Sequence, residues 1–341
     1  MKKRNLDFEN NLLRVMNGQK PKRATLFEFG ISRRHLELLA GREPQGDTKV
    51  DRWRLAIDAM SNAGYDYVRG LASDLRFRQE RREQKKTRGL NGEALIYDWE
   101  SFEKFEWPDM SGQDYSVLED IKPFLPEGMK VVVSGPDGVL ETAINLLGYD
   151  NLCIMLYDEP ELVEAVFHEI GSRFLRYYEN AASADTVGML CSNDDWGFNT
   201  QTFLPPALLR KYVFPWHKRI VEVAHANGKP CMLHSCGYFN EIIDDVIDDM
   251  GFDARHSYED NITPVEKAYE DFNGRIAVLG GMDVNFLASR TPEEIYKRAR
   301  NMLEMSAERG GYALGSGNSI ADYIPHENYL AMIRAAHEFD T

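Results

Sequence analysis

The chain has 341 residues, of which 43% are hydrophobic, and its formal net charge is −15. This length suits one α/β barrel with insertions, and the apolar content is enough for a large core. The negative charge disfavours nucleic acids and anionic membranes as partners, because it repels their phosphates. No window reaches the roughly 18 apolar residues of a membrane helix. The charged start MKKRNLDFENNLLRV lacks the apolar region of a signal peptide. We therefore expect a cytoplasmic protein with no nucleic-acid and no membrane partner.

The four cysteines are few and irregularly spaced, which is not the pattern of a disulfide scaffold: Cys153, Cys191, Cys231 and Cys236. Reduced thiols are expected, and one of them can serve as a ligand. A basic segment, Arg76 to Arg88, holds seven basic and two acidic residues. It is either a solvated helix or loop with ion pairs, or a lid or docking surface for an acidic partner.

Short apolar runs rich in β-branched residues alternate with helical patterns, and this alternation predicts parallel strands joined by crossover helices. The predicted strands are 24–30, 65–71, 130–136, 186–194, 230–236, 252–259, 276–283 and 311–317. Eight such strands close a (β/α)8 barrel, also called a TIM barrel. The whole chain, 1–341, is expected to form one such domain.

Three helices between the strands have clear boundaries. One begins at Pro160, where proline suits the first turn. Another begins at Pro206, is kinked or split by Pro215, and stops at Gly228. A third has a capped start at 291–294 and ends at Gly310 and Gly311.

The irregular region lies between the second and third predicted strands, at 74–128. It is first charged and then aromatic, with Tyr97, Trp99, Phe102, Phe105 and Trp107. An insertion of this length on a barrel is usually functional, and we expect a lid-like segment. Its aromatic residues either pack together or line a ligand site.

Catalytic groups of a barrel come from the carboxyl ends of its strands, and nearly every predicted strand here ends in polar residues. These are Glu28, Arg69, Ser134, Asp194, Asp195, His234, Cys236, His256, Glu259, Asp283, Ser316 and Asn318. A chain that needed only to fold would not require this convergence.

A metal site is the sharpest hypothesis. His234 and Cys236 stand two residues apart on an extended chain, so both side chains lean to the same face. Imidazole and thiolate together suit zinc, and Glu259 at the end of the next strand could supply an oxygen ligand. The alternative is a buried histidine bonded to a carbonyl beside a cysteine that packs as a small hydrophobe.

The adjacent carboxylates Asp194 and Asp195 form either a turn or helix cap, or a general acid or base at the mouth. Neighbouring residues on a strand point in opposite directions, so one of the two is expected to face the pocket. Glu28 is either paired with Arg69 or functional.

Two further strand-end residues have both a structural and a functional interpretation. His256 is interpreted as a core or supporting group and not as a ligand. Asp283 follows Gly280 and Gly281, so it either contacts a ligand or stabilises a turn.

Three stretches resemble the uroporphyrinogen decarboxylase superfamily: MLHSCGYFNEIIDDVIDDMGFDA, GRIAVLGGMDVNFLASRTPEEI and GGYALGSGNSIADYIPHENYLAMIRAA. The order of motifs matches too, from Asp-Asp-Trp-Gly to Pro-x-Glu-Asn, over roughly residues 180 to 338. The resemblance implies a TIM barrel. It leaves open two branches, a decarboxylase without metal or cofactor and a zinc-dependent methyltransferase that serves a corrinoid protein and a thiol.

The chain departs from both branches. The decarboxylase signature Arg-Gln-Ala-Gly-Arg-Tyr is absent, and the matching place reads EFGISRRHLELLAG, with Arg33 and Arg34. His234 and Cys236 fit the methyltransferase pattern, but Asn318 stands where that branch has a further cysteine. Either Glu259 compensates as a zinc ligand, or the site is metal-free and Asn318 binds substrate.

We therefore expect a zinc-dependent methyltransferase that works with methylcobamide on a corrinoid partner protein and with a small-molecule methyl acceptor. The expected metal ligands are His234, Cys236 and Glu259; the catalytic candidates are Asp194, Asp195 and Glu28; the substrate contacts are Asn318, Asp283 and Arg69. The alternatives are a metal-independent decarboxylase of a carboxylated substrate and a non-catalytic barrel that docks a corrinoid protein. A homodimer is compatible with each.

Overall fold

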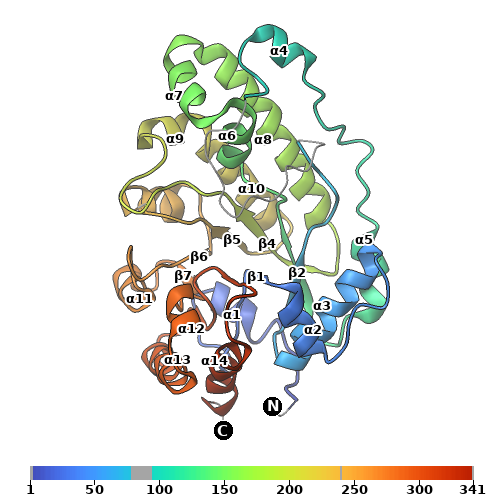
Figure 1. The fold of residues 1–341 in the computed structure, drawn as a ribbon, viewed down its shortest axis with the longest axis vertical. Coiled ribbons are helices and arrows are strands. Elements are labelled where there is room, and N and C mark those ends of the chain that lie inside the picture. The colour runs from blue at the N-terminus through green and yellow to red at the C-terminus, as the bar shows by residue number, and fades with distance from the viewer. Residues whose placement is uncertain (1–2, 78–93, 239, 340–341) are drawn as a thin grey trace.

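The computed structural model describes residues 3–77, 94–238 and 240–339, and its centre is one curled sheet of parallel strands with helices around it (Figure 1). The sheet has seven strands in chain order: β2 (Tyr67–Gly70), β3 (Lys130–Ser134), β4 (Val187–Asn193), β5 (Cys231–His234), β6 (Ala254–His256), β7 (Ala277–Leu279) and β8 (Tyr312–Ala313). Each lies inside a predicted strand, which confirms the predicted alternation.

The first predicted strand pairs with the far edge of the sheet. Leu26 forms a parallel bridge with Leu314, and the amide of Phe27 donates to the carbonyl of Leu314 over 2.8 Å. On its other side, the Tyr67 hydroxyl accepts from the Glu28 amide at 2.6 Å and donates to the Glu28 carbonyl at 2.7 Å. The segment therefore lies between β8 and β2, the two ends of the sheet.

A second, two-stranded sheet follows these segments and was not predicted from the sequence. In it, β1 (Gly30–Ile31) pairs in parallel with β9 (Ser319–Ile320). This pairing holds the chain beyond the first and the last predicted strands side by side, and Asn318 directly precedes β9.

The helices begin and end where local chemistry predicts. Pro160 opens α8 (Pro160–Ala182). The helix predicted from Pro206 is split into α9 (Pro206–Tyr212) and α10 (Phe214–Ala226), because Pro215 cannot donate within a continuous helix. Thr291 and Glu294 form a reciprocal capping box at the start of α13 (Pro292–Ser306).

The remaining helices pack outside the strands. They are α1 (Leu12–Met16), α2 (Arg33–Ala40), α3 (Lys49–Ala63), α6 (Val139–Leu147), α7 (Tyr149–Asp158), α11 (Val265–Phe272), α12 (Val284–Ser289), α14 (His326–Phe339), the 3-10 turn η2 (Asn240–Ile242) and the π turn η3 (Asp245–Asp249). Within the described ranges no single helix is long and apolar enough to cross a membrane; α6 and α7 pass that test only together and are bent by 93° at their junction.

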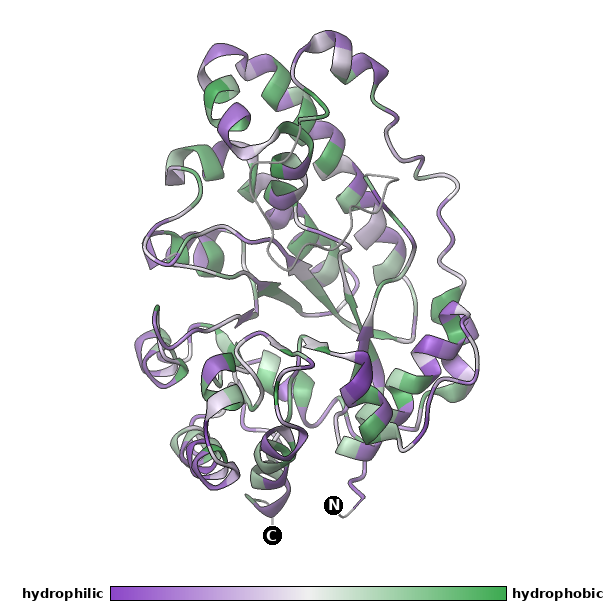
Figure 2. Cartoon of the chain, in the orientation of Figure 1, coloured by the Kyte–Doolittle hydropathy of each residue, from purple (hydrophilic) through white to green (hydrophobic). Residues whose placement is uncertain are grey.

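The core lies between the strands and the inner faces of the helices, where Figure 2 shows apolar residues concentrated. Val131, Val132 and Val133 of β3 are all fully buried, because one face of the strand packs on helices and the other faces the inside of the curled sheet. Continuous apolar runs of this kind are typical of parallel strands covered on both sides.

The predicted insertion 74–128 is described in part. Residues 78–93, which include most of the basic segment 76–88, lie outside the described residues. The remainder contains α4 (Trp99–Lys104), α5 (Val117–Asp120) and the 3-10 turn η1 (Lys122–Phe124). Trp107 contacts the rings of both Phe102 and Phe105, so these three aromatic residues pack together. A lid role for the insertion stays a prediction.

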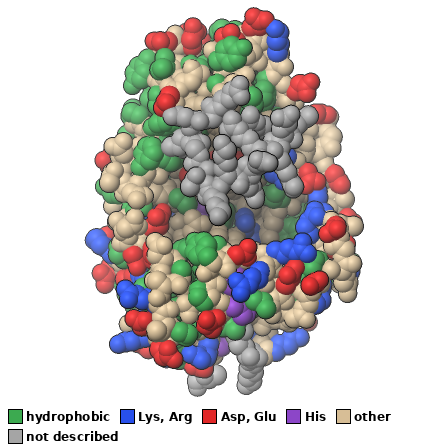
Figure 3. Space-filling view, viewed as in Figure 1, with side chains coloured by type: hydrophobic (Ala, Val, Ile, Leu, Met, Phe, Trp, Pro, Cys, Tyr) green, Lys and Arg blue, Asp and Glu red, His purple; other side chains and the backbone are tan. Residues whose placement is uncertain are grey.

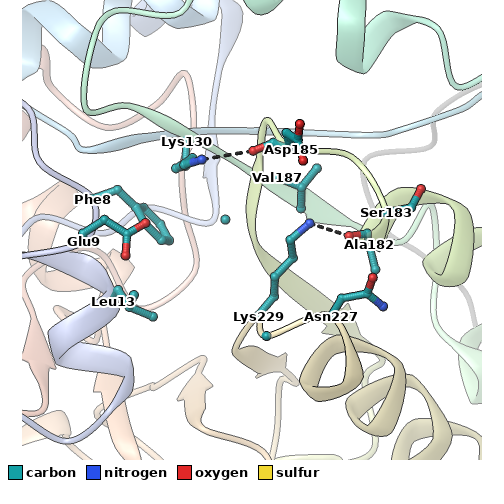
Figure 4. Close-up of a pocket in the computed structure, with 12 residues that line it drawn as sticks. Phe8, Glu9, Leu13, Lys130, Ala182, Ser183, Asp185, Val187, Asn227 and Lys229 are labelled. Carbon is teal, nitrogen blue, oxygen red and sulfur yellow. Dashed lines mark hydrogen bonds between the residues drawn. The ribbon is translucent and has the colours of Figure 1, made fainter.

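A pocket of about 360 Å³ lies at the amino-terminal ends of β3 and β4 (Figure 4). Its lysines satisfy main-chain carbonyls near the end of α8: Lys130 donates to Asp185 at 3.0 Å, and Lys229 donates to Ala184 at 2.8 Å. A cation there also complements the negative end of the helix dipole. The pocket thus lies at the opposite end of the strands from the polar residues that are the candidates for catalysis and metal binding.

The Tyr67 hydroxyl that joins the first segment to β2 can be tested by Tyr67→Phe. The substitution leaves two buried backbone groups of Glu28 without this partner, so we expect a loss of about 1–3 kcal/mol in the free energy of unfolding, measured by urea denaturation. Tyr296→Phe is the control, since the hydroxyl of Tyr296 bonds to Glu338 near the surface, and it should change stability by less than about 0.5 kcal/mol. Equal effects of the two substitutions would contradict the role of Tyr67.

Candidate functional site

His234 and Cys236 meet at the carboxyl end of β5, as their spacing predicts. His234 is the last residue of the strand, and its Nε2 atom lies 3.8 Å from the Cys236 sulfur. The His234 side chain is 6% exposed and the Cys236 side chain is half-buried, so both are sheltered but not sealed. The structure thus places the sulfur beside the imidazole, and His234 Nδ1 faces His256 and not a carbonyl.

Asp195, from the end of the neighbouring strand β4, completes a group of three donor atoms. One oxygen of its carboxylate, the Cys236 sulfur and a ring nitrogen of His234 all lie within 4.8 Å of one another. The Cys236 amide also donates to Asp195 Oδ1 at 2.9 Å. Nitrogen, sulfur and oxygen donors at this spacing fit zinc better than magnesium or calcium.

Two glycines bring the loops after β4 and β5 together. Gly237 has a φ of +89°, and a Cβ on it would lie 2.1 Å from the carbonyl oxygen of Gly197. Only glycine permits both this backbone conformation and this close approach. The glycines of the Cys236-Gly237 and Trp196-Gly197 pairs therefore have a structural role. They let the two loops approach each other, and this places Asp195 beside Cys236.

A chain of hydrogen bonds fixes where the proton of His234 resides. The Ser316 carbonyl can only accept, so His256 Nε2, 3.0 Å away, must carry a hydrogen. Burial lowers the pKa of His256 to about 3, so the ring is neutral and its Nδ1 is an acceptor. His234 Nδ1 lies 2.7 Å from that atom and must donate to it. The lone pair of His234 Nε2 is thereby left facing Cys236, which is the state that a metal requires.

Phe29 holds the plane of the same imidazole. Its ring stacks on His234 with centroids 3.6 Å apart and planes 2° from parallel. Sequence reasoning missed Phe29, because an aromatic residue within the first predicted strand carries no signal that it faces a histidine from the fifth.

Asn318 and Ser257 surround the Cys236 sulfur. The Asn318 amide donates to Sγ at 3.2 Å, and Sγ itself donates to the Ser257 hydroxyl at 3.9 Å. Burial, and then the nearby charge of Asp195, raise the pKa of the Cys236 thiol well above its usual range. The thiol is therefore protonated at neutral pH unless a bound cation reverses this balance.

Glu259 stands at the edge of this group. Burial raises the pKa of its carboxyl, and the charges of Asp283 and Asp195 raise it further. These effects place it near Asp195, but it does not belong to the three-residue group that the structure brings within ligand distance. The expected ligands His234 and Cys236 are thus together, with Asp195 where Glu259 was expected.

Asp194 points away from the mouth. It is fully buried, and it accepts from the amides of Leu140 and Glu141 at the start of α6 and faces His217 Nε2 at 3.0 Å. This arrangement anchors the end of β4 to α6 and α10. Because side chains alternate along an extended segment, it also directs Asp195 toward Cys236.

Asp283 likewise has a structural position. Its side chain accepts from the Phe286 amide at 2.9 Å and so caps α12, and it accepts from the Asp260 amide at 3.0 Å. The turn-stabilising interpretation of this residue is the one that its contacts support.

Glu28 and Arg69 are not paired with each other. The Glu28 carboxyl accepts from the Ser316 amide at 3.0 Å and contacts the Ser316 hydroxyl, and burial raises its pKa to about 8. Arg69 donates to the Ser134 hydroxyl at 2.6 Å and lies over the Phe29 ring. Both stand beside the His234 group but not in it.

Comparison with known proteins identifies the family. Residues 95–339 match the family described as Uroporphyrinogen decarboxylase (URO-D). The chain belongs to the uroporphyrinogen decarboxylase family. This confirms the superfamily that the sequence motifs indicate.

Relatives of both branches appear among the matches. A uroporphyrinogen decarboxylase of Anaeromyxobacter sp. is 27% identical over 61% of this chain and 57% of its own length. A methylated-thiol–coenzyme M methyltransferase of Methanosarcina mazei is 24% identical over 69% of this chain and 62% of its own length. This URO-D family chain thus spans less than two thirds of the length of these curated relatives.

Solved structures extend the likeness of the fold. A methyltransferase from Methanosarcina mazei superimposes with a TM-score of 0.73 at 19% identity, covering 99% of this chain and 100% of that one. A putative vitamin-B12 independent methionine synthase from Listeria monocytogenes gives a TM-score of 0.51 at 11% identity, covering 94% and 96%. The near-complete coverage shows that this URO-D family member shares the fold of those proteins over almost its whole length.

The proton arrangement of the two histidines can be observed directly. Long-range ¹H–¹⁵N NMR spectra of metal-free protein should show His234 protonated at Nδ1 and His256 at Nε2. His256→Leu removes the acceptor, and His234 should then lose its single tautomer. His225→Leu, on the surface of α10, is the matched control and should leave the His234 signals unchanged. A His234 protonated at Nε2 in the unaltered protein would contradict the hydrogen-bond chain.

Proposed function

We propose that this protein is a zinc-dependent methyltransferase that moves a methyl group between a corrinoid protein and a thiol or similar small acceptor. The observation that carries the proposal is the group formed by Asp195, His234 and Cys236, with the lone pair of His234 Nε2 held toward the other two. We also propose that the segment 24–30 is the first strand of a closed (β/α)8 barrel comprising one domain, 1–341.

The donor set fits a metal ion. His234 Nε2, Cys236 Sγ and an Asp195 oxygen would hold zinc, and Glu259, beside them, is the candidate for a fourth oxygen ligand. When bound, zinc lowers the pKa of a thiol, so that the acceptor reacts as a thiolate at neutral pH. One carboxylate in place of a second cysteine makes the ion a stronger Lewis acid and binds it less tightly.

The reaction balances without any further reagent. The acceptor sulfur gives up its proton and forms a bond to the methyl carbon of the methylcobamide. The cobalt–carbon bond breaks, and its electron pair stays with the cobalt of the partner protein. Asp195 would take the proton, since the raised pKa of Glu28 keeps that carboxyl protonated near neutral pH, while Asp194 acts on Asp195 by position alone.

The polar residues at the carboxyl ends of the strands give the partner protein one place to present its methyl group. A corrinoid protein would approach this mouth, and the small acceptor would lie beneath it. Support comes from the Methanosarcina mazei relative, which is named a methylated-thiol–coenzyme M methyltransferase. We also propose a cytoplasmic protein without nucleic-acid or membrane partners, because a formal charge of −15 repels their phosphates.

A metal-independent decarboxylase is the second candidate, and Glu28 favours it. A carboxyl whose pKa is raised to about 8 holds its proton near neutral pH and could donate it to the carbon that loses carboxylate. The Anaeromyxobacter relative is named as such an enzyme. Metal analysis separates the two candidates, since only the methyltransferase requires the ion.

The metal content of the purified protein tests the leading proposal. We expect about one zinc per chain by elemental analysis, lost in Cys236→Ser and in His234→Ala and weakened in Asp195→Asn, because each substitution removes a donor. Cys153→Ser, which changes a half-buried thiol of α7, should keep its zinc. Equal zinc in Cys236→Ser and Cys153→Ser would reject the site.

The residue at position 318 should set the strength of the metal site. In Asn318→Cys a second sulfur takes the place of an amide that lies 3.2 Å from Cys236 Sγ, so zinc should bind more tightly in competition with a chelator. Asn318→Ala removes the N–H donor without adding a ligand and should not tighten binding. Tighter binding in both variants would contradict a role for the added thiolate.

A further inference from the structure

Arg69 presents an unpaired positive charge beside the candidate site. It lies in β2, and its single hydrogen bond among the described residues is from Nη1 to the Ser134 hydroxyl, at 2.6 Å. No carboxylate of the described residues forms an ion pair with it. The guanidinium keeps its proton in any protein environment, so a charge without a counter-ion from residues 3–77, 94–238 or 240–339 is held here.

The remaining nitrogens of Arg69 are open to a ligand. They have no hydrogen-bond acceptor among the described residues, yet they are not fully enclosed, unlike Nε of Arg23. The side chain as a whole is half-buried. Holding a partly desolvated cation without a partner costs free energy that a bound anion would recover.

Phe29 sets the distance from this cation to the metal-binding group. The His234 ring lies flat on one face of Phe29, with centroids 3.6 Å apart. The Arg69 guanidinium carbon lies 4.1 Å from the same ring centroid, and because one face is already covered, it occupies the other. One aromatic ring therefore separates the guanidinium from the imidazole.

The inner face of the sheet beside His234 also carries a polar side chain. Asn193 pairs with His234 across β4 and β5, and so shares its face of the sheet. Its Oδ1 atom is buried without a hydrogen-bond partner among the described residues. Figure 3 shows a hollow near the centre of one face of the molecule, with basic and apolar side chains visible in it.

We propose that Arg69, held in place by the buried Ser134 hydroxyl, binds the anionic end of a small substrate whose other end reaches His234, Cys236 and Asp195. The anion is a carboxylate, sulfonate or phosphate, because a planar guanidinium binds each of these with paired hydrogen bonds. The substrate is short, since it needs only to pass the edge of Phe29. This inference rests on the proposed function for what happens at the reacting end, but not for the binding of the anion.

The test measures the binding of small thiols to the zinc-loaded protein by calorimetry. The probes are 3-mercaptopropionate, 2-mercaptoethanesulfonate and 2-mercaptoethyl phosphate, with the neutral 2-mercaptoethanol as reference. We expect the best anionic thiol to bind about tenfold or more tightly than the neutral one, as hydrogen bonds to a charged group predict. The rank of the three probes identifies the kind of anion.

Substitutions assign the preference to Arg69. Arg69→Gln should remove it and leave the affinity for 2-mercaptoethanol unchanged, and Arg69→Lys should retain part of it, since the charge remains but the paired geometry is lost. Arg54→Gln is the matched control, because Arg54 of α3 also lies over a phenylalanine ring, that of Phe124. This variant should keep the full preference for the anionic thiol. No preference in the unaltered protein, or equal loss for charged and neutral thiols in Arg69→Gln, would overturn the proposal.

A second arm separates this inference from the proposed function. Metal-free protein is titrated with 3-(methylthio)propionate and with its methyl ester, neither of which needs a metal to bind. A preference for the acid that Arg69→Gln abolishes supports the anion site even if the protein binds no zinc. Zinc binding without any such preference would reject the anion site and leave the metal site standing.

Discussion

The site depends on one carbonyl that cannot donate a hydrogen bond. The Ser316 carbonyl accepts from His256 Nε2, so His256 Nδ1 must accept from His234 Nδ1. His234 is therefore left with Nε2 unprotonated. Burial keeps both rings neutral, so a change of protonation does not disturb the arrangement near neutral pH. The tautomer of His234 is therefore set by the main-chain carbonyl of Ser316, in the segment after β8 and far away in the sequence.

The end of β4 gives two adjacent carboxylates different tasks. Asp194 receives the free amides at the start of α6 and contacts His217, which fixes the strand end in place. Asp195, on the other side of the same extended backbone, faces Cys236. Alternation along the extended backbone thus directs Asp194 toward α6 and α10 and Asp195 toward Cys236. The contacts of Asp194 limit where the Asp195 carboxylate can lie.

Phe29 organises the neighbouring space in a similar way. One face of its ring aligns the His234 imidazole and the other supports the Arg69 guanidinium. An apolar ring between a neutral imidazole and a cation keeps the two apart while both pack against it. A reacting end and a charged end of one small molecule would find fixed positions on its two sides.

The sequence by itself determined the alternation of strands and helices, the break at Pro215, the capped start of α13 and the meeting of His234 with Cys236. Each depends on local chemistry or on the two-residue period of a strand, which can be read along the chain.

Only the tertiary structure decided that Asp195 joins this pair, that Asn318 donates to the sulfur, and that Phe29 and His256 orient the imidazole. Those contacts join residues from different strands, so they depend on register and on the approach of loops at Gly197 and Gly237, which no local pattern encodes.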